Sequence, residues 1–196
     1  MLSIIQAAGW PIWPLIICSI VGLTIVIERA ITLRRARVAP DKLLDEVIAI
    51  TRTSLPSTDV INKLGNSCAL GSVLAAGVRS VVAEPRITED TLRLVFENAG
   101  RVMVHRLERY LNTLGTVATA SPLLGLFGTV VGMIEIFGSQ SPTGGSNPAQ
   151  LAHGISIALY NTAFGLMIAI PALMFYRYFR GRADEYTVDM EQAAER

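Results

Sequence analysis

The chain has 196 residues, with 17 Lys and Arg against 16 Asp and Glu, and its formal net charge of +1 gives no nucleic-acid signature, since such partners require a clustered basic face. Hydrophobic residues make up 51% of the chain, and the mean hydropathy is +0.45, while the charged residues are confined to particular segments. This pattern indicates a membrane protein with a soluble part.

The first apolar run covers residues 9–27. A cleaved signal peptide is the competing interpretation, but it would have a basic n-region and a small-residue cleavage site, and no Lys or Arg precedes Arg29. We therefore expect residues 1–33 to hold a retained first transmembrane helix. Trp10 and Trp13 near its start fit an aromatic belt at the membrane interface.

Residues 34–110 are predicted to form a cytoplasmic helical domain. Apolar residues at core spacing indicate one helix over residues 41–50 and a second over residues 70–82. Thr88, followed by two acids, has the character of a helix N-cap. Because neither Pro nor a turn cluster follows it before the membrane, the pattern predicts one long helix that continues into the bilayer.

The stretch 110–176 contains no Lys, Arg or Asp, and its only acid is Glu135. A run of this length holds two spans of about 20 residues, as a hydrocarbon core of about 30 Å requires. We assign a second transmembrane helix to residues 111–138 and a third to residues 151–179. An uncharged periplasmic turn, residues 139–150, connects them.

Arginines follow the first span and the third span, and the segment from residue 180 to residue 196 is a cytoplasmic tail. Because cationic flanks stay on the cytoplasmic side, the N-terminus is predicted to be periplasmic. The predicted fold is an all-α membrane protein with three transmembrane helices. Long helices extend from the membrane into the cytoplasmic helical domain.

Small and hydroxyl residues recur inside both later spans, where they mark surfaces that meet protein or water. Close helix packing is predicted at four glycines: Gly125, Gly128, Gly132 and Gly165. Gly128 and Gly132 form a GxxxG step, which lets a neighbouring helix backbone approach closely.

Thr129 and Thr162 lie at one level of the predicted hairpin. At 1.5 Å of rise per residue, both fall about 15 to 17 Å from the outer ends of their helices, near the middle of the bilayer. From depth alone, two interpretations stay open. Either the hydroxyls serve a function together, or each one bonds the i−4 carbonyl of its own helix and does nothing else.

Two sequence blocks carry a family resemblance. Residues 120–134 read ASPLLGLFGTVVGMI, and residues 154–172 read GISIALYNTAFGLMIAIPA. They resemble the ExbB/TolQ branch of the MotA/TolQ/ExbB proton-channel family, and ExbB above all. The resemblance covers both later spans closely and the cytoplasmic region loosely.

The resemblance implies an inner-membrane stator: a pentamer of this chain around the single spans of an ExbD-type partner, with proton flow driving a TonB-like transducer. Thr129 and Thr162 match the pore-facing threonines of the family, which sit opposite the partner's membrane aspartate. Many ExbB proteins have a Glu where this chain has Ile157. The partner's aspartate is then the proton carrier expected at mid-bilayer.

Glu135 is a carboxylate like the Glu that relatives have at the position of Ile157, but it is not at the same depth. It lies about 6 Å along the helix axis from the outer end. It is either a residue of the membrane rim or a proton-entry group. His153 is interpreted as interfacial, because no second ligand stands one helical turn away. Cys18 and Cys68 lie in unrelated segments, so neither a disulfide nor a metal site is predicted, and no cofactor is expected.

Two other functions stay open. A TolQ-like stator of the Tol-Pal envelope system would have the same chemistry and a different client, and a non-conducting scaffold would use the small residues for packing alone. An enzyme is not favoured, because the sequence has no nucleotide loop, no metal-ligand spacing and no Ser/His/acid set in one compartment.

Overall fold

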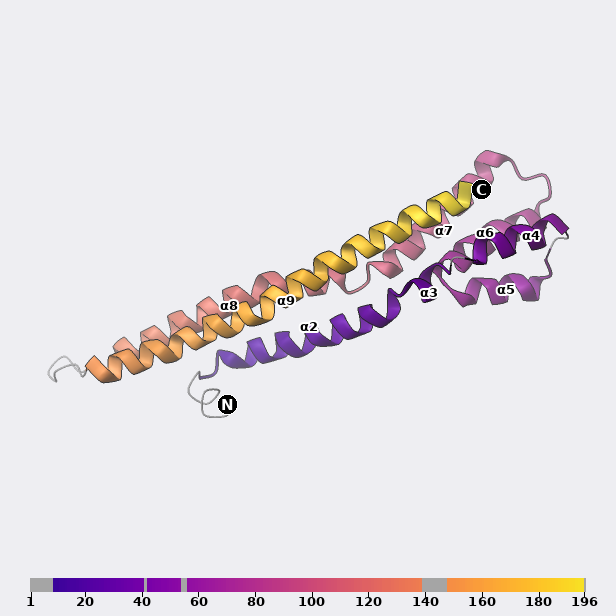
Figure 1. Ribbon diagram of the computed structural model, residues 1–196. Coiled ribbons are helices and arrows are strands. Elements are labelled where there is room, and N and C mark those ends of the chain that lie inside the picture. Colours follow the sequence, from indigo (N-terminus) through magenta and orange to yellow (C-terminus); the bar gives the residue numbers. More distant parts are fainter. Residues whose placement is uncertain (1–8, 41, 54–55, 139–147, 196) are drawn as a thin grey trace. The chain divides into compact units, whose positions relative to one another are not determined.

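The structure is a computed structural model that describes residues 9–40, 42–53, 56–138 and 148–195 (Figure 1). Within its helices, the side chains of residues 53, 148–151, 153 and 157 are outside the description. All regular secondary structure in the described residues is helical. The helices are α2 (Ile12–Thr32), α3 (Arg35–Val38), α4 (Leu43–Thr53), α5 (Thr58–Ser67), α6 (Ala69–Ala83), α7 (Glu89–Leu107), α8 (Leu111–Gly138) and α9 (Pro148–Glu195).

Among the described residues, three helical stretches are long and apolar enough to cross a membrane. They are Ile12–Thr32, Glu89–Gly138 counted across a short break, and Gly154–Glu195. This confirms the predicted all-α fold with three membrane-length helices. Large apolar side chains such as Leu126 and Met167 are exposed on these helices, which suits contact with lipid.

The chain forms two compact units. The first contains Met1–Ile27 and Tyr110–Arg177, and therefore most of α2, all of α8 and the first part of α9. The second contains Glu28–Arg109 and Tyr178–Arg196, and therefore α3 to α7 and the last part of α9.

In the first unit, α8 runs beside the first part of α9 (Figure 1). Leu111 and Leu114 are fully buried at the start of α8. Helix α2 approaches α8 at Gly22, where an added Cβ would lie 3.3 Å from the Val117 Cγ1 atom. Small side chains at these crossings permit the backbone contact that replaces the hydrophobic drive inside a membrane.

In the second unit, α6 packs against both α5 and α7. The Phe96 ring of α7 occupies the space where a side chain at Gly77 would stand. Thr88 caps α7 as predicted, since its Oγ1 atom accepts from the Thr91 amide at 3.4 Å. The predicted helices over residues 41–50 and 70–82 correspond to α4 and α6, with ends that differ by one to three residues.

Helix α5 was not predicted. Its sequence is mostly polar, and among its residues only Ile61 is buried. Val60, Ile61 and Leu64 nevertheless stand at the three- and four-residue spacing of a helix face, so the sequence held a periodic signal that the prediction missed.

The prediction of one long helix from Thr88 into the bilayer is wrong. Helix α7 ends at Leu107, α8 begins at Leu111, and Tyr110 between them has a left-handed backbone with φ of 64°. Nothing in the local sequence requires this break. Its physical reason lies in Arg29, whose guanidinium donates to the last carbonyls of α7.

Helix α9 continues without interruption through the predicted tail. Its last part is fixed inside the second unit by Tyr186, a side chain that is 1% exposed. The Tyr186 hydroxyl donates to the Leu33 carbonyl at 2.8 Å and accepts from the Arg182 guanidinium at 2.6 Å. The tail is therefore a packed helix.

Candidate functional site

Thr129 of α8 and Thr162 of α9 meet in the first unit. Their hydroxyl oxygens are 2.5 Å apart, within hydrogen-bonding distance. Both side chains are partly buried. The equal depth estimated from residue counting thus corresponds to direct contact between the two hydroxyls.

The two hydroxyls also contact carbonyls of both helices. Thr129 Oγ1 lies 3.2 Å from the Gly125 carbonyl of its own helix and 3.2 Å from the Ala158 carbonyl of α9. Thr162 Oγ1 lies 3.2 Å from the same Gly125 carbonyl, across the helix interface. Only the contact of Thr129 with the Gly125 carbonyl is a bond to the i−4 carbonyl of the same helix. The other two contacts join α8 to α9.

Each hydroxyl has one proton, so the pair has two donors for four acceptor oxygens, those of the Gly125 and Ala158 carbonyls and of the two hydroxyls themselves. When one threonine donates to the other, the second threonine donates to a backbone carbonyl. Reversing the hydroxyl-to-hydroxyl bond changes the donor without moving a heavy atom. The arrangement is chemically suited to hydrogen-bond a polar group in more than one protonation state.

Glycines bring the two helices close enough for this contact. A Cβ at Gly125 would lie 2.7 Å from the Asn161 carbonyl oxygen, and one at Gly165 would lie 2.5 Å from the Ser121 carbonyl oxygen. Both distances are too short for any side chain, and the obstacles are backbone atoms. Close packing at these two predicted positions is a property of the structure.

The GxxxG step faces the same interface. A Cβ at Gly128 would lie 2.9 Å from the Asn161 Cβ atom, and one at Gly132 would lie 3.1 Å from the Ala158 Cβ atom. All four predicted packing glycines thus lie where α8 and α9 approach each other.

Asn161 is the residue that the sequence analysis left without a role. Its side chain is 2% exposed, lies against Gly128 and is the immediate neighbour of Thr162. The sequence could have singled out Asn161, because an amide inside an apolar span is costly to bury.

Glu135 does not join the threonine pair. It is exposed on α8, six residues after Thr129, which is about 9 Å along the helix axis. The side chains of His153 and Ile157 lie outside the described residues, as does most of the predicted periplasmic turn.

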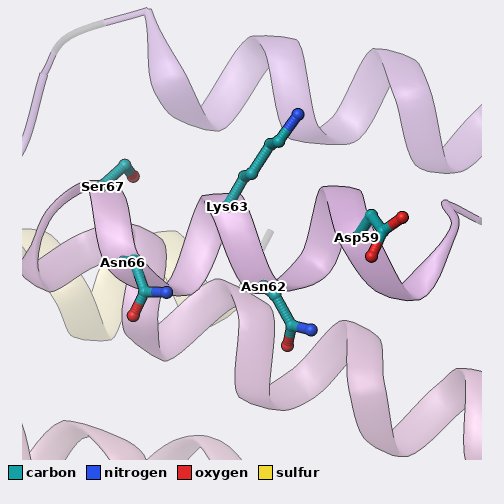
Figure 2. Close-up of a pocket in the computed structure, with 5 residues that line it drawn as sticks. All are labelled: Asp59, Asn62, Lys63, Asn66 and Ser67. Carbon is teal, nitrogen blue, oxygen red and sulfur yellow. The ribbon is translucent and has the colours of Figure 1, made fainter.

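The second unit contains a cleft between α7 and the last part of α9, lined by Phe96, His105 and Met190 among others. In the part of the chain that the structure describes, no group of three His, Cys, Asp or Glu side chains gathers in a way that would hold a metal ion. A shallow polar pocket lies on α5, where Asn62 and Asn66 point one way and Lys63 another (Figure 2). Asn62 accepts from Arg79 at 3.0 Å, and the whole pocket is the solvated face of one helix.

Comparison with known proteins decides the family. Residues 67–192, which include both helices of the threonine pair, match the model of the MotA/TolQ/ExbB proton channel family. The chain belongs to this family. Sequence relatives agree with this assignment. A biopolymer transport protein of Synechocystis, ExbB-like 3, is 31% identical over 89% of this chain and 82% of its own length.

Members of the MotA/TolQ/ExbB family with different names match this chain. The biopolymer transport protein exbB1 of Vibrio cholerae is 31% identical over 86% of this chain and 74% of its own length. The Tol-Pal system protein TolQ of Pseudomonas aeruginosa is 37% identical over 52% of this chain and 46% of its own length. The ExbB/TolQ branch is thereby supported, and both of its members are represented.

Proposed function

We propose that this chain is the proton-channel stator subunit of an ExbB-ExbD-type motor in the bacterial inner membrane. It couples proton motive force to a TonB-like transducer for import across the outer membrane. The observation that carries the proposal is the contact between Thr129 and Thr162, two hydroxyls that join two membrane-length helices in a chain of this family.

The proton carrier comes from another chain. The stretch 110–176 has one carboxylate, Glu135, and it is displaced from the pair along α8. A single-span ExbD-type subunit supplies a membrane aspartate to the pair. Because the hydroxyls both donate and accept, they bind that carboxyl whether it is protonated or ionised. Glu135, near the outer end, is assigned to proton entry.

The assembly expected from the family is a pentamer of this chain around the partner spans. Its N-terminus is periplasmic and its C-terminus cytoplasmic, in accord with the arginines that follow the first and third spans. Gly125, Gly128, Gly132 and Gly165 hold α8 against α9 and so keep the threonine pair together.

The test is proton flux into liposomes that contain this chain together with an ExbD-type subunit. Thr129→Val and Thr162→Val remove the hydroxyls at nearly constant volume, and each should abolish flux while preserving the complex. Thr129→Ser keeps a hydroxyl and should retain flux.

Thr119→Val is the matched control, because the Thr119 hydroxyl contacts carbonyls of its own helix only, those of Gly115 and Thr116. It should leave flux unchanged. Wild-type flux no greater than that of the Thr-to-Val variants would favour a non-conducting scaffold, in which the glycines serve packing alone.

A TolQ-like stator is the second candidate, favoured by the match to the Pseudomonas aeruginosa protein. It has the same threonine chemistry and a different client. Deletion of the gene separates the two: loss of iron-complex uptake supports the import role, whereas detergent sensitivity and chaining of cells support the envelope role.

A further inference from the structure

The cleft of the second unit has no part in the proposed function. Helix α7 and the last part of α9 run side by side in this unit (Figure 1), and Glu108 of α7 pairs with Arg180 of α9 at 3.1 Å. The cleft lies between the two helices, has a volume of about 880 Å³ and reaches Val73 of α6. Apolar side chains on its wall include Phe96 of α7 and Met190 of α9. A space of this size with an apolar wall is a candidate contact surface.

Gly100 stands on the α7 side of the cleft. A Cβ atom added at this position would meet no atom within 4 Å. Glycine inside a helix costs about 1 kcal/mol relative to alanine, so the chain by itself would be more stable with a side chain here. Open space beside a missing side chain indicates that another segment approaches α7 closely at this point.

The cleft has an excess of negative charge. Two arginines, Arg93 and Arg101, line it together with His105 and five glutamates, which are Glu89, Glu97, Glu108, Glu191 and Glu195. Both arginines pair with Glu97, at 3.7 Å and 3.6 Å. Among the described residues, three of the glutamates form no ion pair: Glu89, Glu191 and Glu195. The cleft therefore offers carboxylates to cations from another molecule.

Arginine is the side chain that fits an apolar wall with an acidic rim. Its aliphatic stem covers apolar surface while the guanidinium stays in contact with water or with carboxylates. The planar guanidinium also stacks on aromatic rings, and Phe96 supplies such a ring at the wall. The chemistry of the cleft thus favours a segment that presents arginines.

The same chain presents such arginines at the level of the cleft. Arg34 and Arg37, at the start and within α3, are exposed. The Leu33 carbonyl accepts from the Tyr186 hydroxyl at 2.8 Å, so Arg34 is level with Tyr186, the neighbour of the cleft residue Thr187. No described residue of α3 lines the cleft. In one copy, the arginines and the cleft are therefore separate surfaces at one level of the second unit.

We propose that the cleft between α7 and α9 receives Arg34 and Arg37 of a second copy of this chain. The guanidinium groups pair with the unpaired glutamates, above all Glu191, and the stems cover the wall beside Gly100. Copies in one membrane stand at one height, so surfaces at the same level meet. Because the two surfaces differ, the contact repeats from copy to copy and can close a ring. The proposal rests on the side-by-side copies that the proposed function includes, and it names a contact between them.

The first test is cross-linking between two differently tagged copies in membranes. Both copies have Cys18→Ala and Cys68→Ser, where serine can still cap α6. One copy has Glu191→Cys and the other has Arg34→Cys. Because each copy then has a single cysteine, a short bis-maleimide can join only two different copies. A product with both tags is expected.

Asp59→Cys in place of Glu191→Cys is the matched control, because Asp59 is an exposed acid of α5 that lies outside the cleft. It should give several-fold less of the product with both tags. A yield from Glu191→Cys no greater than that from Asp59→Cys overturns the proposal.

The second test fills the cleft from within its own copy. Gly100→Leu places a side chain in open space, so the protein should still fold, and the yield of the same cross-link should fall several-fold. Gly181→Leu also adds a side chain where nothing lies within 4 Å, but outside the cleft, and should leave the yield unchanged. Equal yields in these two variants overturn the proposal.

The third test exchanges the charges, with the two cysteines moved to Ala194 of the cleft and Ala36 of α3. Glu191→Lys in the copy that contributes the cleft should lower the yield several-fold, and Arg34→Glu in the other copy should restore it. If the second substitution lowers the yield further, the two residues do not meet and the proposal is wrong.

Proton flux with an ExbD-type subunit is measured on the same preparations. Cross-linking without wild-type flux supports this contact and contradicts the proposed channel. Wild-type flux without cross-linking supports the channel and overturns the contact. The two proposals can therefore fail separately.

Discussion

Gly165 of α9 lies directly against the carbonyl oxygen of Ser121 of α8, at a separation that leaves no room for a Cβ atom. A Cβ at this position would also lie 3.1 Å from the Cα atom of Gly125. Both obstacles belong to the backbone, so neither can rotate away. This contact sets how closely the two helices that carry the threonine pair can approach.

We expect Gly165→Ala to lower the free energy of unfolding by about 1–3 kcal/mol, because α8 and α9 must separate to admit the methyl group. The measurement is the midpoint of unfolding in detergent. Gly181→Ala is the matched control in the same helix, where nothing lies within 4 Å. It should be neutral or stabilise by up to about 1 kcal/mol through helix propensity. Equal effects at the two positions would contradict the packing role of Gly165.

Gly128 should respond differently, because its obstacle is the Asn161 side chain. Gly128→Ala alone is expected to destabilise the helix pair, and Asn161→Ala should remove part of that penalty by freeing space. A double-mutant cycle measures this coupling, which we expect at about 0.5–3 kcal/mol. Additive effects of the two substitutions would show that the side chains do not compete for the same volume.

Tyr186→Phe removes a buried hydroxyl that joins Arg182 to the Leu33 carbonyl. We expect a loss of about 1–3 kcal/mol in unfolding free energy, because the buried carbonyl loses its donor. Tyr178→Phe, in an exposed part of the same helix, should have almost no effect. Equal stability of the two variants would argue that α9 is not fixed by this hydrogen bond.

The ion pair between Glu108 and Arg180 should contribute little to stability. The two side chains are 31% and 44% exposed, and partly exposed pairs are worth about 0–1 kcal/mol. A double-mutant cycle with Glu108→Gln and Arg180→Gln should give a coupling in this range that falls as salt is raised. A larger coupling that is insensitive to salt would indicate a shielded pair.

Periodicity and composition were sufficient for the long apolar helices and for the Thr88 cap, because each depends on residues close together in sequence. They were also available for α5, where Val60, Ile61 and Leu64 stand at helical spacing, but the prediction missed this helix. They also gave the wrong result at Tyr110, because Arg29 lies 77 and 78 residues from the carbonyls that it binds. A contact between residues so far apart in the sequence cannot be predicted from a local pattern.

The sequence by itself determined the three membrane-length helices of the described residues, the glycines between the last two, and the shared level of Thr129 and Thr162 along their two helices. Hydropathy and helical rise act along the chain and can be read residue by residue. Only the tertiary structure decided that the two hydroxyls touch, that Asn161 is buried beside them, and that α7 and α8 are separate helices. Those outcomes depend on which groups compete for the same space or the same acceptor, and that competition exists only once the helices are packed.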